Sequence, residues 1–363
     1  MPKSPRRPPQ LRGRIFRGSV ARARGLLTRN DLRSSAWRPL FRDVYADARI
    51  AVTHRHRCLA VTRWLVPPGT AIAGRSAAAL YGVGSIPPDE PIDVLTPSGP
   101  PDTTPNPPLP AVPPGAPPAR RPDQPPPAPD ERFPPPSAPV PVPPSRSPTP
   151  AIPPQGGRRL GPVAGLCVHR SAVQPGDVVD RAGIPVTSPA RTCWDVACWL
   201  DVVEAVVVID GLLARRIVDV PTLREYALAR AGRRGWRSLL RAVDLADAGA
   251  ESPQESRTRV RLVLAGLPRP RTQWVVSDGG RFVARLDLAW PEFRVAVEYD
   301  GLWHDDPEQF HRDRRRLNRL LGGDWLVLHV TARRLREDFD GFLDEVRAAL
   351  RSRGHRSRPR PQG

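Results

Sequence analysis

The sequence predicts a multidomain α+β protein in which a proline-rich insertion divides the first half and a mixed sheet forms the second. The length of 363 residues allows two or more domains, each with its own hydrophobic core. Of the 49 prolines, 26 lie between Pro100 and Pro154, where there is little apolar surface to bury. Residues 251–351 alternate between helix and strand patterns in the order αβββαβα, which predicts a mixed sheet with helices on both faces.

The first half contains short elements before the insertion and longer helices after it. Thr28 and Asp31 have the spacing of a capping box, which predicts a helix start. Residues 37–47 predict a tight turn that leads into a short strand. Helix patterns cover 53–66, 74–81 and 188–246, and strand patterns cover 91–97 and 165–171. We expect these two strands to pair across the insertion, which is itself predicted to be extended and disordered.

The second half has the clearest order of elements. Ser252 as N-cap, Pro253 at the first helical position and Glu255 at the third have the arrangement of a capping box. Three alternating strand patterns follow, TQWVVS, RFVARLDLAW and RVAVEYD. An arginine-rich helix over 307–321, an apolar strand over 325–330 and an amphipathic helix over 337–351 complete the predicted unit.

The charge balance points to a polyanionic partner. Lys+Arg total 56 against 37 Asp+Glu, which gives a formal net charge of +19. Such an excess is typical of proteins that bind nucleic acid. Lys3 is the single lysine, so this chain has no second lysine for a Walker A loop or a Schiff base. A GC-rich genome would explain arginine in place of lysine, but it would not explain the net charge.

The cysteines and the apolar segments exclude several classes of protein. Four cysteines without a CxxC pair exclude a zinc ribbon and do not form a disulfide pattern. The N-terminus lacks the apolar core of a signal peptide. The most apolar stretch, 194–213, contains four acidic residues, which favours a buried helix over a membrane span. We therefore expect a soluble, cytoplasmic protein that does not enter a membrane.

Three acidic residues are expected to converge on the predicted sheet. If the turn between the last two strand patterns centres between Glu292 and Phe293, Asp287 lies opposite Glu298. Asp300 shares the face of Glu298, because side chains alternate along a strand. Three carboxylates this close favour a hard cation, so the pattern predicts bound Mg²⁺ or Mn²⁺. The alternative is a solvent-facing surface on which these acids pair with nearby arginines.

Residues that follow the acids suggest a phosphate-containing substrate. His304 comes directly after the strand and would supply a general acid or base. The arginines of the predicted helix would bind phosphates; they are Arg312, Arg314, Arg315, Arg316 and Arg319. A hard cation, a proton-transferring group and phosphate-binding arginines are the requirements of phosphodiester hydrolysis.

The runs LDLAWPEFRVAVEYDGLWH and RDRRRLNRLLGGDWLVLHVT resemble the PD-(D/E)xK nuclease superfamily, in particular a domain-of-unknown-function family related to very-short-patch-repair endonucleases. The resemblance covers 251–331 and implies a restriction-endonuclease-like sheet. It implies that Asp287 and Glu298 bind the metal ion, with a carbonyl contribution from Tyr299. His304 would match the histidine of the family, and Glu255 an acid on the first helix. The lysine position of the motif is occupied by Asp300.

The runs GLLTRNDLRSSAWRPLFRDVYAD, AGRSAAALYGV and IPVTSPARTCWDVA resemble AbiEi-type antitoxins and regulators of type IV toxin–antitoxin systems. The resemblance covers roughly 14–97 and 160–245 and implies a winged-helix-like N-terminal region. Arg29, Arg33, Arg38 and Arg42 would then face DNA phosphates. A solvated basic face on a protein interaction domain is the alternative interpretation.

Together these features predict a DNA-binding protein that hydrolyses DNA phosphodiesters with Mg²⁺. The alternative is a DNA-binding regulator or antitoxin whose nuclease-like domain is inactive, with a cognate toxin or a repair protein as its partner. The predicted segments are a basic disordered tail (1–13), the winged-helix-like region (14–97), the insertion (98–160), a helical remainder (161–247), the endonuclease-like domain (251–351) and a second basic tail (352–363).

Overall fold

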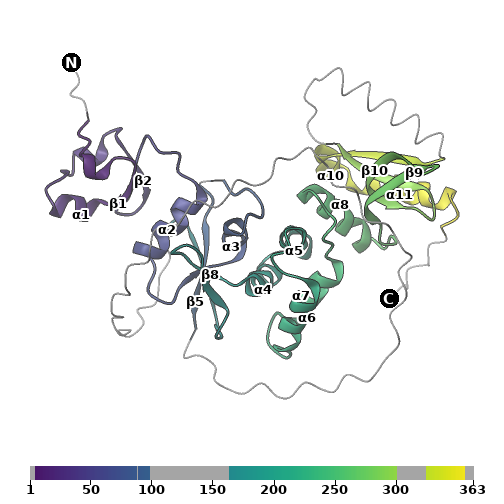
Figure 1. The fold of residues 1–363 in the computed structure, drawn as a ribbon, viewed down its shortest axis with the longest axis horizontal. Helices are drawn as coiled ribbons and strands as arrows, with labels where there is room; N and C mark the ends of the chain where they lie inside the picture. The colour runs from purple at the N-terminus through teal and green to yellow at the C-terminus, as the bar shows by residue number, and fades with distance from the viewer. Residues whose placement is uncertain (1–4, 88, 99–162, 301–323, 356–363) are drawn as a thin grey trace. The chain divides into compact units, whose positions relative to one another are not determined.

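The structure, a computed structural model, describes residues 5–87, 89–98, 163–300 and 324–355. These residues form three sheets with helices around them, which confirms the predicted mixture of helices and strands (Figure 1). The proline-rich insertion, the predicted helix over 307–321 and both ends of the chain lie outside the described residues. No helix within the described ranges has the length and apolar character that crossing a membrane requires.

The first sheet is small and antiparallel, with the strand order β1-β3-β2. Its elements follow the chain as η1 (Pro9–Leu11), β1 (Ile15–Arg17), α1 (Gly18–Ala23), η2 (Asp31–Arg33), β2 (Trp37–Phe41) and β3 (Val44–Asp47). Residues 37–47 are thus a two-stranded hairpin, where the sequence predicted a turn and one strand. The turn contains Asp43 in a left-handed conformation (φ 63°), which the sequence pattern did not indicate.

The first sheet begins its contacts before residue 14, within the segment expected to be a tail. The Arg7 guanidinium lies 2.6 Å from the Asp47 carboxylate, and the Gly13 N–H donates to the same side chain at 2.9 Å. Leu11 is buried in the small core around Phe16 and Trp37. Residues 7–13 therefore belong to the first folded segment. The reciprocal hydrogen bonds between Thr28 and Asp31 are present, and they lie at the start of the 3-10 turn η2.

The second sheet has five strands in the order β6-β5-β4-β8-β7. The strands are β4 (Ala71–Ile72), β5 (Ile92–Pro97), β6 (Leu166–Ser171), β7 (Val178–Asp180) and β8 (Pro185–Thr187). Strands β5 and β6 pair in parallel, with Ile92 opposite Leu166 and Pro97 opposite Ser171. This pairing confirms that the proline-rich insertion interrupts one sheet and does not separate two domains.

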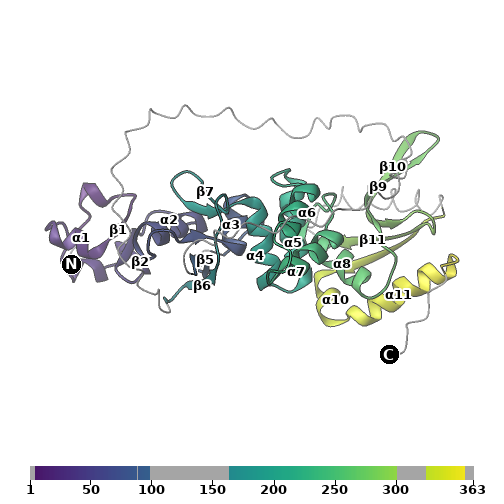
Figure 2. The same ribbon diagram turned by 90° about the horizontal axis from the view of Figure 1, so that it is seen from below.

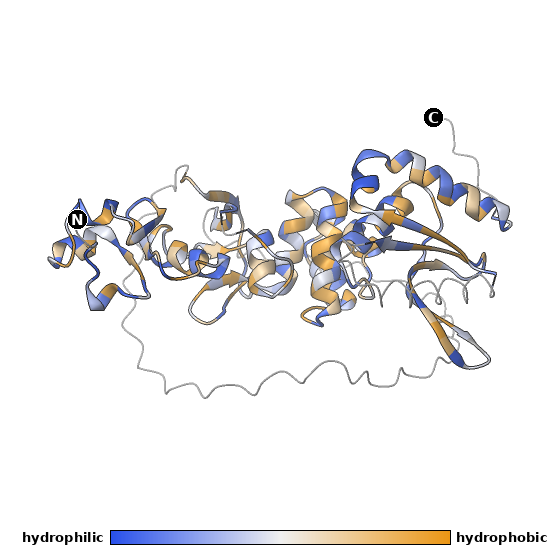
Figure 3. Cartoon of the chain, turned by 90° about the horizontal axis from the view of Figure 1, so that it is seen from above, coloured by the Kyte–Doolittle hydropathy of each residue, from blue (hydrophilic) through white to orange (hydrophobic). Residues whose placement is uncertain are grey.

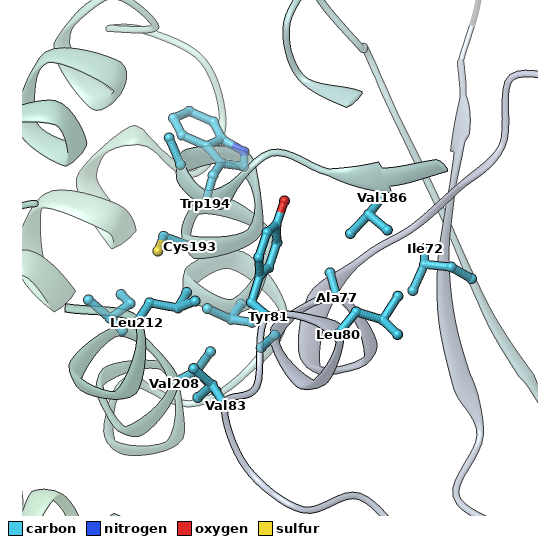
Figure 4. Close-up of a cluster of buried hydrophobic side chains, with 14 of the residues drawn as sticks. Ile72, Ala77, Leu80, Tyr81, Val83, Val186, Cys193, Trp194, Val208 and Leu212 are labelled. Carbon is cyan, nitrogen blue, oxygen red and sulfur yellow. The ribbon is translucent and has the colours of Figure 1, made fainter. Parts of the chain in front are cut away.

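Helices pack on this sheet and on one another to form the largest core. They are α2 (His54–Trp64), α3 (Gly74–Leu80), α4 (Pro189–Trp199), α5 (Val202–Ala214), α6 (Val220–Leu228) and α7 (Trp236–Leu245). Figure 4 shows how side chains from β4, α3, β8, α4 and α5 meet, with Tyr81 beside Cys193 and Val83 beside Val208. The helices α4 to α7, all between residues 188 and 246, confirm the predicted helical stretch.

A network of buried charges lies within this helical region. Arg191 on α4 is 3% exposed and contacts two aspartates, Asp195 at 2.8 Å and Asp177 at 2.9 Å. The other oxygen of Asp177 contacts Arg230 at 2.9 Å and accepts a hydrogen bond from the Tyr226 hydroxyl at 2.7 Å. Because each buried carboxylate has a guanidinium partner, the network stabilises the packing of α4 against α6 and the segment before β7.

The third sheet has four strands in the order β12-β11-β10-β9. After α8 (Pro253–Leu264) come β9 (Arg271–Asp278), β10 (Arg281–Trp290) and β11 (Val295–Asp300), then β12 (Leu326–Thr331), α10 (Ala332–Glu337) and α11 (Phe339–Ser352). Strands β9, β10 and β11 are antiparallel neighbours, and β12 is parallel to β11. Figure 2 shows β9 and β10 as a long hairpin, and Figure 3 shows polar and apolar patches along α11, as expected for an amphipathic helix.

Helix α8 contacts both the third sheet and the helical region. Leu262 of α8 is buried with the apolar residues of the third sheet. On its other side, Arg259 is fully buried and contacts Asp210 of α5 at 2.7 Å, and the Ser256 hydroxyl donates to the same carboxylate. The predicted break around residue 250 is thus a short loop, and α8 connects the two cores.

Candidate functional site

The register of β10 and β11 places Asp287 beside Glu298. Leu288 pairs with Val297, and Trp290 with Val295, so the next position along the ladder joins Asp287 to Glu298. Directly opposed residues in an antiparallel pair project from the same face. The apolar partners Leu288 and Val297 are buried on the other face. The predicted juxtaposition of the first two acids is therefore confirmed at the level of backbone register.

Glu255 approaches the same place from α8. The helix begins at the Ser252 N-cap, whose hydroxyl accepts from the Glu255 N–H at 3.2 Å. The Glu255 side chain accepts from the N–H of Glu251 at 3.0 Å, whereas a capping box would use the N–H of Ser252. With 7% of its surface exposed, Glu255 is buried at the start of the helix. One capping interaction thus forms as predicted, and the carboxylate is aimed at the sheet.

A single amide group connects Glu255 and Asp287. The Gln273 Nε2 donates to Glu255 Oε2 at 2.9 Å and to Asp287 Oδ1 at 3.4 Å. The second Asp287 oxygen accepts from the Tyr299 N–H at 3.0 Å. Gln273 has a left-handed backbone (φ 49°), which is uncommon for a residue other than glycine. Two acids from separate elements are therefore held by the same side chain.

The environment of Glu255 disfavours its negative charge. Burial raises the pKa of Glu255, and the nearby charge of Asp287 raises it further, while hydrogen bonds from Glu251 and Gln273 lower it. Within the described part of the chain, neither Glu255 nor Asp287 forms an ion pair with an arginine. Carboxylates gathered without a guanidinium partner are the arrangement that a bound cation would neutralise.

The donor chemistry fits a hard divalent cation. Glu255, Asp287 and Glu298 offer carboxylate oxygens, and Mg²⁺ in proteins commonly uses one or two carboxylates together with water and phosphate oxygens. Among the described residues, no group of three or more His, Cys, Asp and Glu side chains is already assembled around one metal position. A Mg²⁺ ion would thus be held by Asp287 with one neighbouring acid, and phosphate and water would complete its shell.

Asp300, at the lysine position of the resembled motif, is engaged by a different partner. Its carboxylate lies 3.1 Å from the His329 Nδ1 on β12, and both side chains are partly exposed. Asp300 therefore shares a strand with Glu298 as predicted, but its contact is with an imidazole at the end of the parallel strand pair. Neither the pairing nor a role for His329 was predicted from the sequence.

Several predicted site residues lie outside the described residues. They are His304 and the arginines of the predicted helix, Arg312, Arg314, Arg315, Arg316 and Arg319. Their assignment to proton transfer and to phosphate binding stays a prediction.

The four predicted DNA-contacting arginines of the N-terminal segment are exposed. Arg29 precedes η2, Arg33 is its last residue, Arg38 lies on β2, and Arg42 lies in the hairpin turn. None of the four pairs with a carboxylate within the described part of the chain. Positive charge that is left unpaired on a surface is available to an external anion.

Gln273 is the site residue that sequence reasoning missed. It lies in the strand pattern TQWVVS directly before the run of acids, and no charge marks it. The strand pairing supplies the signal: Trp274 opposes Leu286 and Thr272 opposes Leu288, so the position between them opposes Asp287. A search of the neighbouring strand for a polar residue opposite a predicted ligand would have identified Gln273.

Two proteins of Mycobacterium tuberculosis are similar to this chain. They are uncharacterized proteins of the strains CDC 1551 / Oshkosh and ATCC 25618 / H37Rv, and each is 30% identical to this chain over 184 residues. The match covers 50% of this chain and 67% of each relative. No protein-family model matches the chain. No solved structure matches it significantly.

Proposed function

This chain belongs to the same family as the two mycobacterial proteins, and from its own side chains we propose that it binds DNA and hydrolyses DNA phosphodiester bonds with Mg²⁺. The observation that carries the proposal is the convergence of Glu255 and Asp287 on one amide, next to Glu298 on the neighbouring strand. Among the described residues, neither Glu255 nor Asp287 has an arginine partner. A fold that gathers acids in this way sacrifices stability for a binding site.

The residues would divide the chemistry as follows. Asp287 and Glu298 would hold Mg²⁺, which would neutralise the phosphate charge and lower the pKa of a bound water. Water would add to phosphorus as the bond to the leaving sugar oxygen breaks, and a proton would pass to that oxygen. His304, which follows β11 in the sequence, would transfer the proton. The arginines of 312–319 would bind the flanking phosphates.

The elements of the first sheet support a DNA-binding role for the N-terminal segment. Their order is helical turn, strand, helix, helical turn and hairpin, with the last strand in the middle of the sheet. We infer a reduced winged helix in which η2 and the β2–β3 hairpin approach the duplex. Arg29, Arg33, Arg38 and Arg42 would make phosphate contacts there.

The decisive experiment is a plasmid-nicking assay with Mg²⁺ or Mn²⁺. Wild-type protein is expected to relax supercoiled plasmid, and Asp287→Asn is expected to lose at least about 100-fold of the rate. Glu292→Gln is the matched control, because Glu292 is exposed at the turn of the same hairpin and pairs with Arg271. Equal nicking by Asp287→Asn and wild type would overturn the assignment.

The DNA-binding part has its own test in the salt dependence of affinity. Replacing Arg33 and Arg38 with glutamine should weaken DNA binding uniformly across sequences. It should also reduce the slope of log affinity against log salt by about one per lost phosphate contact. An unchanged slope in the double variant would remove these arginines from the interface. The control is Arg75→Gln, since Arg75 is paired with Glu90.

A second function is favoured by one observation, the pairing of Asp300 with His329 at the position where the resembled motif has lysine. A protein that retains the acids but lacks the lysine would act as a DNA-binding regulator or antitoxin, with a cognate toxin or repair protein as its partner. Salt-dependent binding of DNA without nicking in either metal would favour this function over hydrolysis.

A further inference from the structure

We propose that Gln273 is a positioning residue that sets the spacing and orientation of Glu255 and Asp287 for a divalent cation; this inference rests on the proposed function. The Gln273 amide nitrogen carries two hydrogens, and it lies within hydrogen-bond distance of both carboxylates. Its contacts connect α8, which carries Glu255, to β10, which carries Asp287.

The backbone at Gln273 supports a specific role. Its neighbours Thr272 and Trp274 continue the β9–β10 ladder opposite Leu288 and Leu286. Gln273 itself adopts φ 49°, a conformation that costs a residue with a Cβ on the order of 1 kcal/mol. Such strain persists only where the surroundings hold the residue. Here the carboxylates of Glu255 and Asp287 stabilise the conformation, because both accept hydrogen bonds from the Gln273 side chain.

The hydrogen bonds leave the carboxylates able to bind a cation. A carboxylate offers about four lone-pair positions on two oxygens. Asp287 uses one on each oxygen, for Gln273 and for the Tyr299 N–H. Glu255 uses two on Oε2, for Gln273 and for the Glu251 N–H. Both acids are therefore fixed in orientation while lone pairs remain for Mg²⁺.

The amide also offsets the repulsion between the two acids before a cation arrives. Like charges at close range destabilise each other unless positive charge or donors lie between them. The two N–H groups of Gln273 are the donors that the described residues place there. Loss of these donors would let the acids separate, and a cation would then have to reassemble them. Partners of this kind, hydrogen-bonded to metal-binding carboxylates, typically affect metal affinity by about 10- to 100-fold.

The test is a calorimetric titration of the full-length protein with Mg²⁺ and Mn²⁺ in the absence of DNA. Gln273→Met keeps the length of the side chain and removes the amide, so the dissociation constants should rise about 10- to 100-fold. Gln254→Met is the matched control, a partly buried glutamine on α8 whose side chain forms no hydrogen bond within the described part of the chain. Its constants should stay within about twofold of wild type.

A merely structural role is separated by two further measurements. Gln273→Asn tolerates the left-handed backbone but is too short to reach both acids, so it should fold like wild type and still bind the cations less tightly. In a Glu255→Gln background, Gln273→Met should have a smaller effect than in wild type, because one of the two acids that it positions is already neutral.

The outcomes distinguish this inference from the proposed function. Wild-type protein that binds neither cation would overturn the proposed function together with the role of Gln273. Wild-type protein that binds a cation, with Gln273→Met and Gln273→Asn binding it equally well, would overturn the positioning role alone. Weaker binding that tracks a lower thermal midpoint in all variants would also overturn it, in favour of a general effect on folding.

Discussion

The helical region and the third sheet both bury carboxylates, but they provide different partners for them. Asp177 and Asp195 are each 1% exposed, and both contact the guanidinium of Arg191. Glu255 is 7% exposed, and its partners among the described residues are the Glu251 N–H and the amide of Gln273. The first arrangement neutralises charge within the fold, and the second leaves charge for a ligand to neutralise.

The partners of a buried acid therefore indicate whether it stabilises the fold or is available to a ligand. A buried charge costs several kcal/mol unless it is paired and hydrogen-bonded, so a fold that needs only stability supplies a guanidinium. The network around Arg191 follows that rule. The acids at Gln273 do not, and such a departure from local stability is characteristic of a functional site. Four predictions test this contrast, ordered by the size of the expected effect.

Arg191→Met is expected to cost about 3–5 kcal/mol of unfolding free energy, because it leaves Asp177 and Asp195 buried with too little positive charge. Urea denaturation followed by circular dichroism measures the loss. Arg237→Met is the control, since Arg237 is exposed on α7 and should change stability by less than about 0.5 kcal/mol. A loss of under 1 kcal/mol in Arg191→Met would show that the network does not stabilise the fold.

Arg259→Met should cost about 3 kcal/mol, because it leaves one buried carboxylate, Asp210, without its guanidinium. Arg257 lies two residues away on α8 and forms a half-exposed pair with Glu204, so Arg257→Met should cost no more than about 1 kcal/mol. Hydrogen exchange of the α8 amides would locate the loss. Similar costs for the two variants would contradict the distinction between buried and exposed pairs.

The stability of the helical region should rise as the pH falls from about 7 toward 4. Burial raises the pKa of Asp195 to about 7 from its ordinary value of 3.8, although Arg191 lowers it. The folded state therefore binds a proton more readily than the unfolded state in this window, and each pH unit adds at most about 1.4 kcal/mol. Asp195→Asn should flatten this part of the stability profile. A wild-type profile that is already flat there would contradict the raised pKa.

Asp287→Asn should leave stability unchanged or raise it by up to about 1 kcal/mol in the absence of divalent cations. The substitution removes a negative charge beside Glu255. It keeps one oxygen to accept from the Tyr299 N–H, and the new amide nitrogen takes the place of the oxygen that accepts from Gln273 at 3.4 Å. Denaturation in EDTA measures the change, and added Mg²⁺ should stabilise wild type more than the variant. A loss comparable to that of Arg191→Met would place Asp287 among the structural acids.

Much of the third sheet could be predicted from sequence because its patterns are local. The strands RFVARLDLAW and RVAVEYD alternate over a short turn, and that alternation fixes which residues oppose one another. The hairpin at 37–47 was harder, because its turn depends on the left-handed conformation of Asp43. Few residue types mark that conformation reliably, so the sequence pattern did not separate the first strand, β2, from the turn.

The candidate site was predictable in its charged residues and not in its neutral one. Asp287 and Glu298 stand out as acids among apolar neighbours, and Glu255 stands out by its capping position. The role of Gln273 becomes apparent only when β9 is paired with β10 and the Glu255 side chain of α8 is placed beside them. His329 is similar, because its contact with Asp300 depends on a parallel pairing between strands that are far apart in sequence.

The sequence by itself determined the excess of positive charge, the place of the insertion and the register that sets Asp287 beside Glu298, because composition and strand alternation are local properties. Only the tertiary structure decided which acids are neutralised. Arg191 and Arg259 are two of 56 basic residues, and nothing in their local sequence distinguishes them from arginines at the surface. Burial and pairing are set by elements that are distant along the chain, and these contacts separate the acids that stabilise the fold from those available to a cation.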